Sequence, residues 1–443
     1  MTLQTLFLCL TLLSIIAAPL PAQAAFFQQP APSGLTQTSE ESPLSFSPIL
    51  SWDKNFEAIA YEIEIFQQYP TDCDPNDTDS RAVFRTPYIF MNAYNPLLSD
   101  ITSVPRGEAL LWWRVRTLGL NQQPIGPFSE PTALYISDAV PPVNAPPVHL
   151  ANYNEGHGTT LLYPVYNWVR LTAAASFEVQ VFSNDPDHAP ATQPIATLST
   201  EASEIYDPDP RYSNEPFYWR VRALNADGSP QGIWSDTSTF RTAPEDDWTV
   251  AVFGDSISHG GGHISYSPAD FEYSWLAHLA FPAINLSQSG NLTEDMLARF
   301  DQDVLPFHPH YLIIMGGSND LRAAYSVSDV IANMEGIKEK CRQNGIKPIF
   351  LTLPPINPEN IKRAFDEDTD PDWPEKFADF NDYLRQQPHI DTAKALEAYS
   401  PDGRLPDWLG IDGLHEDVIG KELMAARVNA EWTAACAAAD AWQ

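Results

Sequence analysis

The chain has 443 residues and a net charge of −33 at neutral pH, from 58 acidic and 25 basic residues. Nucleic acids and anionic lipid surfaces repel a protein of this charge, so the composition argues against both as partners. The length is enough for two to four domains of about 100–200 residues each.

The N-terminus carries an apolar run from Leu6 to Ile16, followed by the small residues Ala22-Gln23-Ala24. The run is too short for a membrane span, which needs about 20 residues. With its small-residue end it has the pattern of a cleaved export signal, although no Lys or Arg precedes it. We therefore expect residues 1–24 to be a signal peptide and the mature protein to be periplasmic or extracellular, without a transmembrane anchor.

Cysteine is sparse beyond that segment, where Cys73, Cys341 and Cys436 remain. Three thiols do not make a disulfide scaffold. A single Cys341–Cys436 bridge is compatible with an exported protein and stays open at this point.

An internal repeat follows, in which 112-WWRVRTLGLNQQPIGPFS-129 matches 218-YWRVRALNADGSPQGIWS-235. Upstream of each copy stands a tryptophan, Trp52 or Trp168, and then a segment that alternates apolar and polar residues. Alternation predicts half-buried strands. In the WRVR strands we expect Trp and Val to face the core and the arginines to face outward.

Each copy is about 100 residues long, the size of a small sandwich. The early tryptophan, the WRVR strand and the final G-x-(F/W)-S turn resemble fibronectin type III domains. The resemblance predicts two all-β, immunoglobulin-like sandwiches over residues 25–140 and 141–244. Such modules are candidates for contact with a glycan or a surface.

The first copy contains an acidic segment, 72-DCDPNDTD-79, that partly matches a calcium-binding loop. Asp77 stands where the sharp turn needs Gly, and Val83 stands where a bidentate Glu would be. We expect a solvated acidic loop here.

After Trp248 the pattern changes to apolar runs that alternate with helical stretches. The runs are 250–253, 283–286, 311–315 and 349–353. Such runs are typical of parallel strands buried on both faces, so residues 245–443 are expected to form an α/β layer domain. Sites in these sheets form beyond the carboxyl ends of the strands.

The first run leads into 254-GDSISHGGGH-263, which alone allows a nucleophile, a phosphate cradle, a metal-binding His pair or a simple turn. The glycine cluster lacks the Lys-Ser/Thr ending of a phosphate loop. His259 and His263 are four positions apart, but a triple-Gly stretch is a poor helix and no third ligand is evident. A mobile loop beside a site is the favoured interpretation.

Ester hydrolysis by Ser256 would need a base to take its proton and a carboxylate to orient that base. Asp412 and His415, three positions apart before the last helix, can pair locally. Donors for the oxyanion would be the N–H groups of Ser256 and Gly290 and the side-chain amide of Asn319.

These blocks resemble the SGNH or GDSL hydrolase family over about residues 246–436. Gly254-Asp255-Ser256, Gly290, 317–320 and 412–415 match its four blocks in order. The resemblance implies a three-layer α/β/α, flavodoxin-like fold with a parallel sheet, no metal and no cofactor. It also implies a catalytic triad of Ser256, Asp412 and His415, with Ser256, Gly290 and Asn319 in the oxyanion hole.

Other acidic residues near these blocks have structural interpretations. Asp255 is expected to shape the loop by hydrogen bonding, and Asp320 to brace the turn after Asn319. Asp402 and Asp407 are rivals of Asp412, but only Asp412 has a His three positions away.

The sequence thus predicts an exported serine esterase acting on a small-molecule or polysaccharide ester. An O-acetylated carbohydrate is favoured, because sandwich modules on exported enzymes often accompany polysaccharide chemistry and no long apolar lid is evident. The alternatives are a lipolytic esterase or lysophospholipase with the same site, and a non-catalytic secreted binding or adhesion protein.

Overall fold

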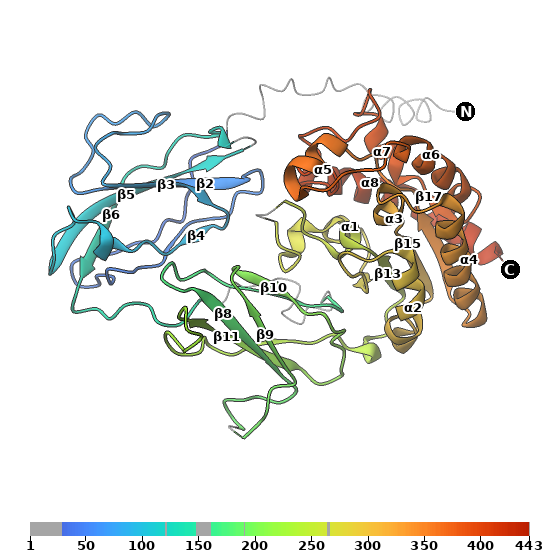
Figure 1. Ribbon diagram of the computed structural model, residues 1–443, viewed down its shortest axis with the longest axis horizontal. Helices are drawn as coiled ribbons and strands as arrows, with labels where there is room; N and C mark the ends of the chain where they lie inside the picture. The colour runs from blue at the N-terminus through green and yellow to red at the C-terminus, as the bar shows by residue number, and fades with distance from the viewer. Residues whose placement is uncertain (1–28, 120–121, 148–160, 190, 264–265, 443) are drawn as a thin grey trace, which may run out of the picture. The chain divides into compact units, whose positions relative to one another are not determined.

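The computed structural model describes residues 29–119, 122–147, 161–189, 191–263 and 266–442 (Figure 1). The expected signal peptide lies outside these residues. The chain divides into two compact units, one formed by residues up to Ala93 with Leu98–Pro141, the other by Tyr94–Leu97 with residues from Pro142 onward. The finer domain boundaries given above stay a prediction.

The first unit is built on a four-stranded antiparallel sheet in the order β3-β2-β5-β6 (Figure 1). These strands are β2 (Ala60–Phe66), β3 (Phe84–Ile89), β5 (Glu108–Leu118) and β6 (Thr132–Ser137). A second small sheet pairs β1 (Leu50–Ser51) with β4 (Ala93–Tyr94). Trp113 and Val115 of β5 are fully buried, as the alternation predicts.

The second copy of the repeat has the equivalent strand order, β12-β11-β8-β9. Its strands are β8 (Ser176–Phe182), β9 (Ala196–Thr200), β11 (Phe217–Leu224) and β12 (Ser238–Phe240), with β7 (Val165–Asn167) paired to β10 (Glu204–Tyr206). The internal repeat is therefore confirmed as a repeat of strand order, and the region is rich in sheet. The fibronectin type of these sheets stays a prediction.

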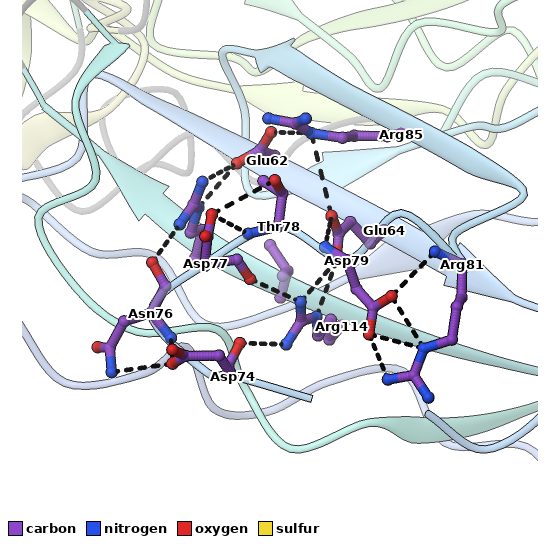
Figure 2. A network of polar contacts seen from close by, with 12 residues as sticks. Glu62, Glu64, Asp74, Asn76, Asp77, Thr78, Asp79, Arg81, Arg85 and Arg114 are labelled. Atoms are coloured by element: carbon purple, nitrogen blue, oxygen red, sulfur yellow. Dashed lines mark hydrogen bonds and ion pairs between the residues drawn. The ribbon is translucent and has the colours of Figure 1, made fainter. Parts of the chain in front are cut away.

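The WRVR arginines of the first copy face away from the core, as expected, but another part of the chain covers them. Arg114 and Arg116 leave the core face, but they are only 1% and 5% exposed. Arg114 binds the buried Glu64 at 2.7 Å and donates to the backbone oxygens of Asp74 and Asp77 at 3.0 and 2.8 Å (Figure 2). The acidic loop therefore covers the arginines. Its carbonyl oxygens, which a bound cation would need as ligands, already accept hydrogen bonds from guanidinium groups.

The same arrangement recurs around the aromatic residue of the G-x-(F/W)-S turn. In the first copy the two guanidinium groups lie over Phe128 at 4.0 and 4.4 Å. In the second copy Arg220 and Arg222 lie over Trp234 at 4.5 and 4.4 Å. Cation–π contact explains why the repeat keeps two arginines and one aromatic residue.

The C-terminal region contains a five-stranded parallel sheet in the order β14-β13-β15-β16-β17. Its strands are β13 (Val250–Gly254), β14 (Ile284–Asn285), β15 (Tyr311–Met315), β16 (Lys347–Leu351) and β17 (His389–Ile390). This is the flavodoxin-like order 2-1-3-4-5, whose switch point lies between the first and third strands. The parallel sheet is confirmed. The sequence missed β17, because His389–Ile390 lies between Pro388 and Asp391 and forms no apolar run.

Helices cover both faces of this sheet (Figure 1). They are α1 (Ser256–His259), α2 (Thr293–Asp303), α3 (Ser318–Arg322), α4 (Val327–Gln343), α5 (Pro358–Phe365), α6 (Trp373–Leu384), α7 (Thr392–Glu397) and α8 (Val418–Ala441). Short 3-10 helices are η2 (Leu98–Asp100), η5 (Pro244–Asp246), η6 (Phe271–Tyr273), η7 (Trp275–His278) and η8 (Leu305–Phe307).

Two apolar clusters separate the layers. Side chains of α2, α4 and α6 pack on one face of the sheet, and those of α8 and η7 pack on the other. This fits an α/β/α fold. Among the described helices none is both long and apolar enough to cross a membrane. Cys73, Cys341 and Cys436 are free thiols, so the structure does not contain the Cys341–Cys436 bridge.

Candidate active site

Ser256 lies at the carboxyl end of β13, where the chain turns into α1. Asp255 is the N-cap residue of α1, and its Oδ1 accepts a hydrogen bond from the Ile257 N–H at 3.0 Å. This confirms the expected loop-shaping hydrogen bond of Asp255. Burial raises the pKa of Asp255 to about 6. The strand end and the cap together fix Ser256 at the switch point of the sheet.

The structure brings Ser256, His415 and Asp412 together across 159 positions of sequence. The Ser256 Oγ and the His415 Nε2 are 2.8 Å apart. The His415 Nδ1 and the Asp412 Oδ2 are 2.9 Å apart. A hydroxyl, an imidazole and a carboxylate in this order can transfer a proton from the serine to the histidine.

The turn that carries Asp412 and His415 precedes α8 and packs against the start of α5. Gly413 has a φ of +82°, and a Cβ there would lie 2.4 Å from the Asn357 backbone oxygen. Only glycine meets both conditions without strain. The carboxylate and the imidazole therefore depend on one residue that brings this turn close to a neighbouring helix.

Burial and mutual contact set the ionisation of this pair. Burial raises the pKa of Asp412, but the charge of His415 and three hydrogen bonds outweigh it, and the pKa is lowered from 3.8. Burial lowers the pKa of His415, but the charge and hydrogen bond of Asp412 outweigh it, and the pKa is raised from 6.5. Asp412 therefore stabilises the imidazolium that forms when His415 takes a proton.

The candidate oxyanion donors come from three strand ends. Ser256 is the first residue of α1, and the first N–H groups of a helix have no acceptor within the helix. Gly290 has a φ of +83°, and no atom lies within 4 Å of where its Cβ would be. Asn319, on α3, donates from Nδ2 to the Asn291 backbone oxygen at 3.0 Å. That bond links the block containing Asn319 to the block containing Gly290.

The other acidic residues are engaged elsewhere. Asp320 accepts hydrogen bonds from the Thr293 N–H at 3.1 Å and the Thr293 hydroxyl at 2.6 Å, which ties α3 to the start of α2. Asp320 therefore holds α3 against α2, and its bracing of the turn at Asn319 stays a prediction. Asp402 accepts from the Arg404 N–H at 3.2 Å, and Asp407 accepts from the Asn360 side chain at 2.8 Å.

His259 is a buried structural residue rather than part of a mobile loop. It ends α1 and is only 1% exposed. Its Nδ1 lies 2.8 Å from the Ser289 Oγ, and its Nε2 lies 2.8 Å from the Tyr163 backbone oxygen. Burial lowers its pKa to about 4. In the part of the chain that the structure describes, no cluster of three His, Cys, Asp or Glu side chains is arranged for a metal ion.

Lys421, which was not expected from the sequence, contacts both the glycine loop after Ser256 and the turn that carries His415. Its ammonium, 1% exposed, donates to the backbone oxygens of Gly261 and Glu416. The first belongs to the glycine loop after Ser256, and the second follows His415 directly. The available signal was a lysine on the apolar face of α8, where its neighbours Met424 and Ala425 are buried.

Phe365, the last residue of α5, was also missed. Its ring lies 6.0 Å from the His415 ring in an edge-on arrangement, and the side chain is 41% exposed. An exposed aromatic side chain thus borders His415, the expected base. Nothing in the sequence distinguished it from the other aromatic residues of the chain.

Comparison with known proteins adds a family. Residues 252–423 match the model of the GDSL-like lipase/acylhydrolase family. The uncharacterized lipoprotein YqeF of Bacillus subtilis is 33% identical over 125 residues. That match covers 26% of this chain and 51% of YqeF, so the chain spans about half the length of this curated relative.

Solved structures of low identity are similar to part of this chain. A lipase/acylhydrolase from Enterococcus faecalis is 24% identical, covers 42% of this chain and 96% of its own, and has a TM-score of 0.35. A putative acylhydrolase from Bacteroides fragilis is 22% identical, covers 43% of this chain and 87% of its own, and has a TM-score of 0.34.

Proposed function

We propose that this chain cleaves esters through an acyl-enzyme on Ser256. Its C-terminal region carries a GDSL-like lipase/acylhydrolase domain, and this domain is an ester-bond hydrolase. The observation that supports this most directly is the continuous contact from Ser256 through His415 to Asp412, at 2.8 and 2.9 Å. The family match spans residues 252–423, and the contact gives the geometry of three residues within that range.

The reaction follows from that contact. The Ser256 oxygen attacks the acyl carbon while its proton moves to the His415 Nε2, and Asp412 stabilises the resulting imidazolium. The negative oxygen of the tetrahedral intermediate accepts hydrogen bonds from the N–H groups of Ser256 and Gly290 and from the Asn319 amide. Collapse breaks the ester bond, and His415 returns the proton to the departing alcohol. Water, deprotonated by His415, then releases the acid from Ser256.

An O-acetylated carbohydrate is the favoured substrate class. The rim next to Phe365 is polar: the side chains of Asp366, Glu367 and Asp368 are 94%, 53% and 90% exposed, and each pairs with Lys362 or Arg322. The net charge of −33 disfavours an anionic substrate such as one that carries a phosphate or a fatty-acid carboxylate. A neutral sugar ester carries no such penalty, and Phe365 offers it an apolar surface beside the polar rim.

The location and the sandwiches belong to the same proposal. The apolar run at 6–16 with its small-residue end supports export to the periplasm or beyond. Contact of the two sandwich regions with a glycan would hold the enzyme on a polymeric substrate. The same regions would also serve a binding or adhesion protein without catalysis.

The test compares acetate release from acetylated xylan with fatty-acid release from lysophospholipid, using the full chain and its Ser256→Ala variant. We expect acetate release that the variant lacks. Fatty-acid release alone would move the substrate to the lipolytic class.

A fluorophosphonate probe should label the wild type and not Ser256→Ala. A wild type that neither reacts with the probe nor hydrolyses either ester would favour a binding or adhesion protein without catalysis.

A further inference from the structure

The side-chain amide of Asn319 can serve an oxyanion only in one of its two orientations. An amide has one end that donates hydrogen bonds and one end that accepts them, with nearly the same shape. Donation to the oxyanion requires that the NH₂ end be held where the substrate oxygen arrives. A flipped amide would present its own oxygen to that negative charge.

Two contacts fix the orientation of this amide. The Asn319 Nδ2 donates to the Asn291 backbone oxygen at 3.0 Å, and the Asn319 Oδ1 accepts from the Arg322 Nε at 3.2 Å. In the flipped orientation an oxygen would face the Asn291 oxygen and an NH₂ group would face the guanidinium N–H, so both contacts would become repulsive. One of the two Nδ2 hydrogens is used for Asn291, and the other is available to a substrate.

Arg322 is itself held in place. It is the last residue of α3, three positions after Asn319, and its side chain is 16% exposed. Its Nη1 lies 2.5 Å from the Glu367 Oε2, and its backbone oxygen accepts from the Asp370 N–H at 2.8 Å. The side chain therefore runs from the polar rim to the Asn319 amide. The positive guanidinium of Arg322 beside the amide oxygen also polarises the Asn319 amide and strengthens its N–H groups as donors.

We propose that Arg322 is a positioning residue of the oxyanion hole, which acts by orienting and polarising the Asn319 amide. The proposal rests on the esterase function given above. It differs from a merely structural role, in which Arg322 would only tie the rim at Glu367 and Asp370 to α3. The difference is measurable, because a residue that acts through Asn319 loses its effect when Asn319 is gone.

The experiment is a double-mutant cycle on the full chain with an activated aryl acetate as substrate, which keeps weak variants measurable. Asn319→Ala is expected to lower kcat by about 100–1,000-fold. Arg322→Met is expected to lower kcat by about tenfold with KM changed less than about threefold, as for an interaction made only in the transition state. In the Asn319→Ala background the same change should cost less than about twofold, because coupled residues are not additive.

Three further variants separate the interpretations. Arg322→Lys retains a cationic donor and should recover part of the kcat. Glu367→Gln removes the charge but keeps a side-chain oxygen that can accept from Arg322, so kcat should fall less than about threefold. Arg342→Met, which removes an exposed arginine paired with Glu339 on α4, is the control for loss of a surface arginine and should leave kcat unchanged.

An Arg322→Met effect of equal size in both backgrounds would overturn the proposal, as would an unchanged kcat in the wild-type background. If Arg322→Met does not fold, Arg322→Lys carries the same cycle, and an additive loss would again overturn the proposal. Failure of the esterase function gives a different result, namely a wild type that shows no hydrolysis and no fluorophosphonate labelling.

Discussion

Asp412 accepts two hydrogen bonds from His415, one on Oδ1 from the backbone N–H at 2.8 Å and one on Oδ2 from the ring Nδ1 at 2.9 Å. One carboxylate therefore holds both the main chain and the ring of the same residue. It fixes the direction in which the ring leaves the backbone and the nitrogen that carries the proton. The same contact raises the pKa of His415 against the effect of burial.

The first prediction concerns the pH profile of Asp412→Asn. His415 is a base only when it is neutral, so kcat/KM of the wild type should rise with pH through a pKa above 6.5. Without the charge of Asp412, burial determines the pKa of His415 and lowers it. The rising limb of the profile should therefore move to lower pH. The plateau should fall by about 10³–10⁴-fold, because the ring also loses its orientation. pH profiles of both proteins on one substrate check this prediction. A limb that does not move would mean that a group other than His415 titrates there.

The second prediction compares two glycines near the site. Gly413→Ala should lower kcat by at least about tenfold, because strain at its φ of +82° and the 2.4 Å approach to the Asn357 oxygen displace the turn that carries Asp412 and His415. Gly403 has a φ of +76° but no atom within 4 Å of its missing Cβ. Gly403→Ala should therefore cost only about 1 kcal/mol of stability and leave kcat intact. Equal kcat values for both variants would contradict the role of the turn.

The sequence predicted the parts of the site whose signal is local. Ser256 follows an apolar run, and Asp412 and His415 are three positions apart, so each could be located from its own neighbourhood. Lys421 could not, because its role comes from packing that joins segments far apart in the chain. Arg322 is only three positions from Asn319, but the spacing alone does not show that its Nε reaches the Asn319 Oδ1. Lys421 contacts the Gly261 oxygen, 160 positions away.

The buried arginines of the first sheet show a second limit. Period-two alternation correctly placed Arg114 and Arg116 on the face opposite the core, but alternation does not say what covers that face. The loop at 72–79 and Phe128 cover it. Strand β17 was missed for a different reason, since His389–Ile390 lies between Pro388 and Asp391 and forms no apolar run.

The third prediction concerns the buried carboxyl group of Glu416, beside Lys421. Burial raises its pKa from 4.5 to about 7. The folded state therefore binds the proton more tightly than the unfolded state. Its contribution to stability is complete below pH 4.5 and is lost as pH rises through about 7. Glu416→Gln is neutral at every pH, so its free energy of unfolding relative to wild type should increase by about 2 kcal/mol from pH 5 to pH 8.

Chemical denaturation at the two pH values measures this difference. Glu422→Gln, an exposed change on α8, is the control and should show the same pH dependence as the wild type. A Glu416→Gln variant that is no more stable relative to wild type at pH 8 than at pH 5 would contradict the prediction. It would mean that Lys421 keeps the buried carboxylate ionised without cost.

The last prediction concerns the ion pair of Arg114 with Glu64, whose side chains are 1% and 0% exposed. Arg114→Met leaves a buried carboxylate without its partner, and breaking such a pair costs about 3–5 kcal/mol. The matched change Arg81→Met removes an arginine whose side chain is 51% exposed in its pair with Asp79, and should cost about 0–1 kcal/mol.

Because the chain has two compact units, hydrogen exchange of the β5 amides in the full chain is the measurement that isolates this sheet. Faster exchange in Arg114→Met alone is the expected result. Equal exchange in both variants would mean that the 72–79 loop, rather than the arginine, stabilises the sheet, and slower exchange on adding calcium would identify that loop as a cation site.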